Sequence, residues 1–116
     1  LQPLVKEFDI QYAEEGEVIV HENTTGQNFY IISSGKVKIT KVIEEQEKQL
    51  TILNIGDFFG EISLIKSSPT IATVTAKEYC VLLRLSRSRF KVFMQSLPDT
   101  HKQHLNDMVE KRLKNN

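Results

Sequence analysis

Residues 58–74 read FFGEISLIKSSPTIATV, and they interrupt a chain that is otherwise rich in short β-branched and aromatic runs. Its first part, residues 58–69, shows no period-2 alternation, so we expect a glycine, one or two helical turns, and a loop ending at Pro69. A helix opened by Gly60 presents free backbone N–H groups, and Glu61 offers a carboxylate that can accept two neighbouring hydroxyls, as on a ribose. An acidic residue here also simply favours a helix N-terminus, so the local pattern leaves both interpretations open.

Short β-branched and aromatic runs lie on both sides of residues 58–69. They are residues 17–21, 29–33, 36–43, 49–54, 71–75 and 80–85. Gly, Asn and Ser separate them, which predicts an antiparallel sandwich or barrel. All five glycines fall between the runs, at positions expected to need positive φ or close backbone approach. In KVKIT (36–40) we expect the polar residues, Thr40 included, on one face, and in EEQEK (44–48) a charged hairpin loop.

The two ends of the chain show helical spacing. Residues 1–8 predict the end of an amphipathic helix. After residue 85, one helix face carries Phe90, Phe93, Met94 and Leu97. Pro98 breaks that helix, and we expect Ser96 to cap the next one, whose stripe is His101, Leu105, Met108, Val109 and Leu113. The predicted fold is mainly β with flanking α: a β-roll (jelly-roll) of about eight short antiparallel strands over about 10–85, a short helix within it, and C-terminal helices over about 87–113.

Length and composition exclude several classes of protein. The 116 residues fit one domain, and 15 Lys and Arg balance 15 Asp and Glu, which argues against an electrostatic nucleic-acid or membrane-surface binder. We see no signal peptide and no apolar run near the ~18 residues of a membrane span. The lone Cys80 excludes an internal disulfide framework and fits a reducing compartment, so we expect a cytoplasmic location. We also expect residues 1–116 to be one domain excised from a larger protein.

Catalytic and metal-binding patterns are weak. His101 and His104 stand at i, i+3 and could share a metal, but no pattern unites them with His21 or Cys80. No nucleophile–base pair or pair of carboxylates is evident. We therefore expect no enzyme activity, no cofactor and no metal.

The stretch 58–74 resembles the phosphate-binding cassette of the cyclic-nucleotide-binding domain family, and we call it the cassette below. FFGEISL, followed after the proline by TIATV, is similar to the family's F-G-E-(L/I)-A-L and P-R-x-A-(T/S)-V. GEVI (16–19), FYIISSGKV (29–37) and LNIGDFFG (53–60) match the family's upstream hairpins and the strand that leads into the cassette. Asn23 stands where a glycine is common, and Asn tolerates the same left-handed conformation. The resemblance runs from Leu4 to about Leu113, and residues 79–90 look like those of kinase regulatory subunits.

This resemblance implies a ligand site. In the family, the cassette Glu binds the ribose 2′-hydroxyl, amides and an Arg bind the cyclic phosphate, and the C-terminal helix closes over the base. Carried over to this chain, Glu61 is the ribose ligand. Gly60, Ile62 and Ser63 supply amide or hydroxyl donors, and Ala72 and Thr73 line the cassette. Ile71 stands where cGMP-selective relatives have a Thr, so the resemblance does not support cGMP selectivity.

Thr70 stands at the family's Arg position. Hydrogen bonds to a charged group contribute about 1.5–3 kcal/mol each, so the loss of the guanidinium is expected to weaken cAMP binding by roughly tenfold to a few hundredfold. Lys66 or Lys77 is a candidate substitute from the flanks. With Ser63, Thr70 makes this end polar but neutral, which suits the 5′-hydroxyl of a nucleoside. The pattern is similar to kinetoplastid protein-kinase-A-type regulatory subunits, which respond to purine nucleosides, although those place an acidic residue where Ser63 stands.

Two functions remain open from the sequence. In the first, a cyclic nucleotide or nucleoside binds between the roll and the cassette, and the C-terminal helices relay the event to an effector such as a kinase catalytic domain. The apolar stripe 105–109 then forms a lid, although such a stripe is also ordinary core packing. In the second, the domain binds no nucleotide and serves protein–protein contact. The sequence shows no helix-turn-helix, and we expect neither nucleic acid nor membrane as a partner.

Overall fold

Eight strands and three helices make up the part of the chain that the computed structural model describes, residues 8–115. The predicted helix over residues 1–8 lies outside these residues, apart from Phe8. The strands are β1 (Asp9–Ala13), β2 (Val18–Val20), β3 (Asn28–Ser34), β4 (Val37–Ile43), β5 (Gln46–Leu53), β6 (Phe58–Phe59), β7 (Thr73–Ala76) and β8 (Cys80–Ser86). The helices are α2 (Glu61–Lys66), α3 (Arg87–Ser96) and α4 (Asp99–Asn115).

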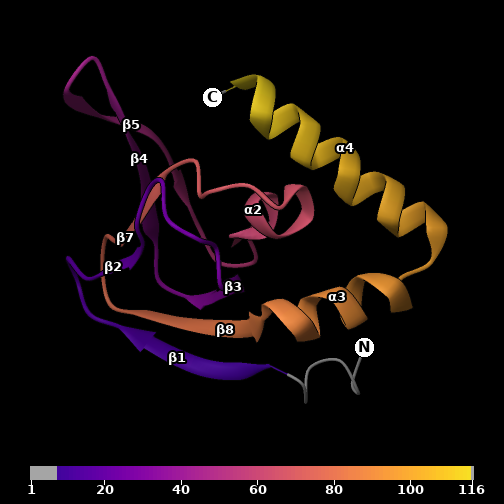
Figure 1. Ribbon diagram of the computed structural model, residues 1–116. Coiled ribbons are helices and arrows are strands. Elements are labelled where there is room, and N and C mark those ends of the chain that lie inside the picture. Colours follow the sequence, from indigo (N-terminus) through magenta and orange to yellow (C-terminus); the bar gives the residue numbers. More distant parts are fainter. Residues whose placement is uncertain (1–7, 116) are drawn as a thin grey trace.

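Two antiparallel four-stranded sheets form a roll (Figure 1), in the orders β1-β8-β3-β6 and β2-β7-β4-β5. The alternating apolar residues of both sheets meet between them, because a half-buried strand directs every second side chain inward. This core is Ala13, Tyr30, Ile32, Val37, Phe59, Val74, Ala76, Cys80 and Leu82. The predicted β-roll is therefore confirmed. No described helix is both long enough and apolar enough to cross a membrane.

The strand β1 is not among the predicted runs, and one predicted loop is shorter than expected. β1 pairs along β8, and β6 contributes only two residues, which pair with Tyr30 and Ile31 of β3. The charged hairpin expected over 44–48 is present, but its turn is shorter than expected, because β5 already begins at Gln46. The turn is Glu44 and Glu45 alone, both at positive φ (53° and 67°), the geometry of a tight two-residue hairpin.

Thr40, one of the polar residues of the alternating stretch 36–40, is buried. The loop after β2 lies over the polar side of the β4–β7 pair at this point. Glu22 accepts a hydrogen bond from the Val42 amide at 3.0 Å and donates its own amide to the Thr73 hydroxyl, also at 3.0 Å. Thr73 is the register partner of Thr40. The loop after β2 is thus hydrogen-bonded to the register partner of the buried Thr40, a contact that strand periodicity does not report.

A second apolar cluster joins the helices to the outer face of the first sheet. It consists of Phe29, Leu64, Leu85 and Phe90. The Phe29 and Phe90 rings lie 5.0 Å apart, so the predicted apolar face of α3 docks on β3. Ser96 was predicted to cap the N-terminus of α4, and that prediction is wrong. Ser96 is the last residue of α3, and its hydroxyl donates to the Phe93 carbonyl. α4 begins at Asp99, and the Pro98 carbonyl accepts the first hydrogen bonds of that helix.

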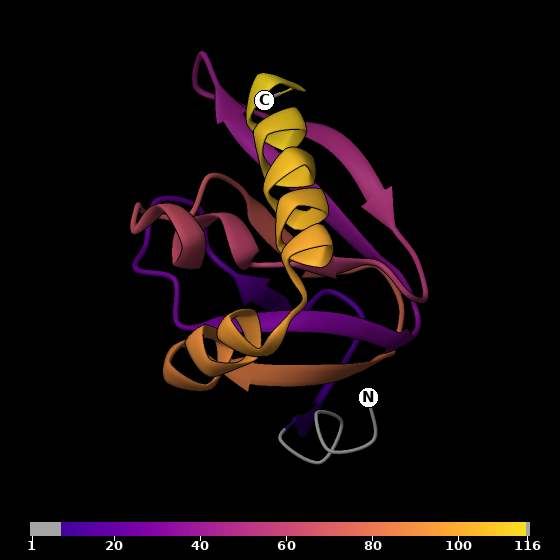
Figure 2. The same ribbon diagram turned by 90° about the vertical axis from the view of Figure 1, so that its right-hand side faces the viewer.

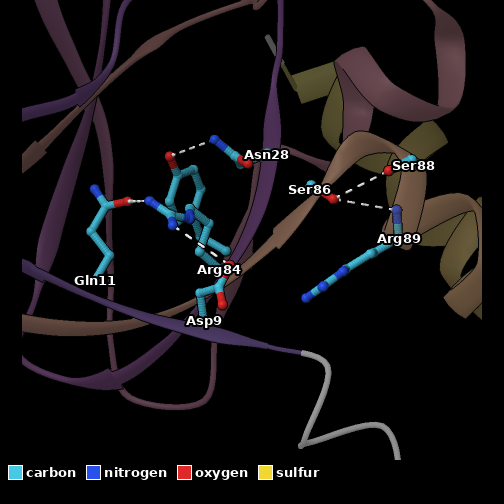
Figure 3. Close-up of polar contacts among 8 residues, drawn as sticks. Asp9, Gln11, Asn28, Arg84, Ser86, Ser88 and Arg89 are labelled. Atoms are coloured by element: carbon cyan, nitrogen blue, oxygen red, sulfur yellow. Dashed lines mark hydrogen bonds and ion pairs between the residues drawn. The ribbon is translucent and has the colours of Figure 1, made fainter.

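Polar contacts fix the ends of β8 (Figure 3). Arg84 donates to the Gln11 side chain at 3.0 Å and lies 3.6 Å from the Asp9 carboxylate, which ties β8 to the edge strand β1. Ser86 caps α3, because its hydroxyl accepts a hydrogen bond from the Arg89 amide. From this point α3 leads into α4, which stands in front of the roll beside α2 (Figure 2).

Candidate functional site

The glycine before α2 sets the geometry of the cassette. Gly60 has φ +91°, and a Cβ at this position would lie 2.5 Å from the Asn28 carbonyl oxygen. Only glycine accepts this conformation so close to β3 without strain. The turn places α2 against the roll, and Glu61, Ile62, Ser63 and Leu64 are all buried. The predicted glycine, short helix and loop are therefore present.

A cavity of about 370 Å³ lies beside the first residues of α2. Its volume falls in the range of small-molecule sites. Its walls come from the second sheet, from the cassette and from one residue of α4. They are Val20, Ile39, Leu50, Thr51, Leu53, Phe59, Gly60, Glu61, Ile62, Ser63, Thr70, Ile71, Ala72, Val74 and Arg112. Seven of the eight predicted site residues are thus brought together. Thr73 does not line the cavity, and its hydroxyl holds the Glu22 amide instead.

Glu61 is paired with an arginine that our sequence reasoning missed. The Arg112 Nη1 donates to both carboxylate oxygens, at 2.6 Å and 2.8 Å, and the guanidinium lies 4.7 Å from the centre of the Phe58 ring. Glu61 is only 1% exposed. Burial raises the pKa of Glu61, and the charge and hydrogen bonds of Arg112 oppose that rise. Arg112 lies three residues after Val109, the helical spacing that could have revealed it.

A second ion pair joins α2 to α4 outside the cavity. The Lys66 ammonium contacts the Glu110 carboxylate at 2.5 Å, and both side chains are substantially exposed. Lys66 was one of two candidates to replace the missing arginine. Neither it nor Lys77 lines the cavity. The two α2–α4 pairs therefore differ, because the residues of one line the cavity and those of the other lie on the surface.

Thr70 uses its hydroxyl to hold the loop that follows β2. It donates to the His21 carbonyl at 2.5 Å and accepts from the Thr24 amide at 2.9 Å. The backbones of Thr70 and residues 23–24 also exchange two hydrogen bonds of 2.8 Å. Asn23 has φ 61°, the left-handed conformation expected for it. Thr70 thus lines the cavity, but its hydroxyl is hydrogen-bonded to the loop after β2.

Ser63 lies against another part of the same loop. A Cβ at Gly26 would come within 1.9 Å of the Ser63 hydroxyl oxygen, so this glycine permits a close approach of the loop to α2. The Ser63 hydroxyl donates weakly to the Gly60 carbonyl at 3.4 Å, and the Gly26 carbonyl accepts from Arg87. Among the residues that line the cavity, only Glu61 and Arg112 carry charge, and they neutralise each other.

Comparisons with known proteins show which family this sequence and fold are similar to. A family model described as the cyclic nucleotide-binding domain matches residues 10–97. The cAMP-dependent protein kinase regulatory subunit of Blastocladiella emersonii is 30% identical over 99 residues, which are 84% of this chain and 24% of that protein. The chain therefore spans about a quarter of the length of this relative.

Two solved structures show the same fold. The Thermus thermophilus catabolite activator protein superposes with a TM-score of 0.86 at 29% identity, covering 97% of this chain and 53% of that one. The regulatory domain of Toxoplasma gondii PKA, solved with cAMP, gives a TM-score of 0.76 at 28% identity, covering 78% of this chain and 35% of that one.

Proposed function

The chain belongs to the cyclic nucleotide-binding domain family, and from this premise we propose that it is a regulatory module which binds a purine cyclic nucleotide or the related nucleoside in the 370 Å³ cavity. One observation carries the proposal: a buried carboxylate, Glu61, in the wall of a cavity of ligand size. A carboxylate has about four lone-pair sites, so beside the two hydrogen bonds from Arg112 it can still accept hydrogen bonds from the hydroxyls of a ribose. In this role Glu61 holds the sugar, and the cassette backbone at Gly60, Ile62 and Ser63 faces the ligand.

The end of the cavity at Ser63 and Thr70 is expected to bind a phosphodiester anion only weakly. The Thr70 hydroxyl already holds the loop after β2, Lys66 is paired on the surface, and the Ser63 hydroxyl is neutral. None of these groups supplies the bidentate charge of a guanidinium. A nucleoside fits this environment better, because it carries no charge and presents two neighbouring hydroxyls to Glu61. In a 3′,5′-cyclic nucleotide only the 2′-hydroxyl is free.

In this proposal, the C-terminal helices relay ligand binding to the effector. α3 packs directly on β3 and β8, and α4 contacts α2 through two ion pairs, so a ligand that changes the cassette bears on α4. The Blastocladiella relative is a kinase regulatory subunit by name, which supports a kinase catalytic domain as the effector and a cytoplasmic location. The protein is a regulator in this proposal and has no catalytic role of its own.

A specific observation also favours the second candidate function, a domain that binds no nucleotide and serves protein contact. Arg112 already satisfies Glu61, so the carboxylate does not require a ligand to be stable. Under this alternative, α4 is a permanent part of the fold.

Calorimetric titration of the 116-residue chain with cAMP, cGMP, adenosine, inosine and guanosine tests the proposal. We expect micromolar or tighter binding of at least one purine ligand, with cAMP weaker than adenosine, and loss of that binding in Glu61→Ala. Silence across the panel would overturn the proposal in favour of the protein-contact role. Unchanged affinity in Glu61→Ala would remove Glu61 from the site.

A further inference from the structure

Arg87, the first residue of α3, anchors the loop after β2 (residues 21–27) to that helix. Its Nη2 donates to the Gly26 carbonyl at 2.5 Å, and its backbone amide donates to the Gln27 carbonyl at 3.0 Å. A guanidinium holds its N–H donors in a rigid plane, so less side-chain freedom is lost for each hydrogen bond that it makes. Two hydrogen bonds from one half-buried residue therefore hold the end of this loop on α3.

The same loop packs against Ser63 in the wall of the cavity. Gly26 is buried, and a Cβ on it would lie 1.9 Å from the Ser63 hydroxyl oxygen. Ser63 is 3% exposed and lines the cavity, and its hydroxyl makes a weak hydrogen bond of 3.4 Å to the Gly60 carbonyl. A hydroxyl both donates and accepts, so this group can still bind a ligand. Gly26 thus contacts Ser63, while its own carbonyl is held by Arg87.

Thr70 and Arg87 hold different parts of this loop. The hydrogen bonds of Thr70 reach residues 21–24. Gly26 and Gln27 lie further along the chain, and the carbonyls of both accept from Arg87. Loss of the guanidinium therefore frees the part of the loop that packs against the cavity wall, while the part held by Thr70 stays in place.

We propose that Arg87 is a positioning residue of the ligand site: it holds Gly26 against Ser63 and so fixes the Ser63 hydroxyl where it meets the 5′ end of the ligand. This inference rests on the proposed function and identifies the residue that sets this end of the site. Arg87 does not line the cavity, so it acts through the loop and makes no contact with the ligand. Its influence is confined to the 5′ end, whereas Glu61 holds the sugar.

Two nucleoside analogues distinguish this role from a general loss of structure. 5′-Deoxyadenosine lacks the hydroxyl that is expected to meet Ser63, and 2′-deoxyadenosine lacks one that is expected to meet Glu61. A neutral hydrogen bond gives a preference of roughly two- to tenfold, so the wild type should bind adenosine more tightly than 5′-deoxyadenosine by that factor. A positioning role changes this preference alone, because a general loosening of the fold lowers all three affinities together.

The test titrates these three nucleosides and cAMP calorimetrically into the wild type and Arg87→Gln, and measures hydrogen–deuterium exchange of the amides of residues 21–27. In Arg87→Gln we expect faster exchange in the loop and loss of the preference for adenosine over 5′-deoxyadenosine. The preference for adenosine over 2′-deoxyadenosine should be unchanged. In a Ser63→Ala background, Arg87→Gln should change the 5′ preference no further, because two residues that act as a unit do not contribute additively.

Two further variants control for charge and for folding. Lys91→Gln removes one positive charge from the next turn of α3, where Lys91 is exposed and makes no hydrogen bond or ion pair with another described residue, and it should resemble the wild type. Arg87→Lys keeps the charge and a donor, so it should lose only part of the 5′ preference. This variant decides the question by the same comparison where Arg87→Gln does not fold.

The outcomes separate this inference from the proposed function. An unchanged 5′ preference in both Arg87 variants, equal losses of the 5′ and 2′ preferences, or equal effects in the Arg87 and Lys91 variants would overturn the positioning role while leaving the proposed function standing. A wild type that binds adenosine and 5′-deoxyadenosine equally, or that binds cAMP alone, would do the same. Absence of binding of all four ligands to the wild type would overturn the proposed function and this inference together.

Discussion

Thr70→Val removes one hydroxyl and keeps the shape of the side chain. Thr70 is only 9% exposed, and its hydroxyl donates to the His21 carbonyl and accepts from the Thr24 amide. Each lost hydrogen bond costs about 0.5–1.5 kcal/mol, and a backbone amide left without a partner adds to this, so the expected loss of unfolding free energy is about 2–3 kcal/mol. With an unfolding entropy of ~2.1 cal/mol/K per residue, a domain of this size loses about 4 °C in Tm per kcal/mol, hence roughly 8–12 °C in total.

Chemical denaturation and thermal unfolding of the wild type and the variant measure this loss. Thr75→Val is the matched control, because Thr75 is half-buried in β7 and its hydroxyl makes no hydrogen bond with the described residues. The control should stay within about 0.5 kcal/mol of the wild type. If Thr70→Val loses no more stability than Thr75→Val, the hydroxyl does not hold the loop, and our reason for excluding it from ligand binding fails.

Three further predictions concern the cassette. Gly60→Ala combines positive φ with a clash at the Asn28 carbonyl and should destabilise the fold by about 2–4 kcal/mol. The control Gly16→Ala, at φ +87° with open space around it, should cost about 1 kcal/mol. Equal losses on chemical denaturation would argue against the close contact at Gly60. The pKa of Glu61 is higher in the native chain than its ordinary value of 4.5, which applies to the unfolded chain. The stability of the wild type should therefore fall relative to that of Glu61→Gln as the pH rises through the raised pKa. Denaturation between pH 4 and 7 measures this difference, and the opposite slope would contradict it. Thr70→Arg should strengthen cAMP binding by roughly tenfold to a few hundredfold in calorimetry; no gain would show that another feature blocks the phosphate end.

Local signals in the cassette predicted much of the site. A glycine followed by an acidic residue and an apolar helical turn is a short-range pattern, and Gly60 and Glu61 adopt the conformations that it implies. The left-handed conformation of Asn23 is likewise a property of one residue and its neighbours. The alternating strands predicted the roll because each buries one face.

Long-range contacts could not be predicted in the same way. β6 is a strand because it pairs with β3, and the buried Thr40 lies opposite Thr73, whose hydroxyl accepts from the distant Glu22 amide. The Thr70 hydroxyl was expected to make the cavity polar, but the loop 21–24 takes its hydrogen bonds. Arg112 lies 51 residues from Glu61, and the sequence pattern on α4 emphasised only its apolar residues. In each case the partner is far away along the chain.

The most direct test of the central claim, that Glu61 holds the sugar of a purine ligand, is a calorimetric comparison of adenosine with 2′-deoxyadenosine. A hydrogen bond to a buried carboxylate contributes about 1.5–3 kcal/mol, so the wild type should prefer adenosine by roughly tenfold or more. Glu61→Gln should lose most of that preference. Equal affinity of the wild type for the two nucleosides, or an undiminished preference in Glu61→Gln, would contradict the account.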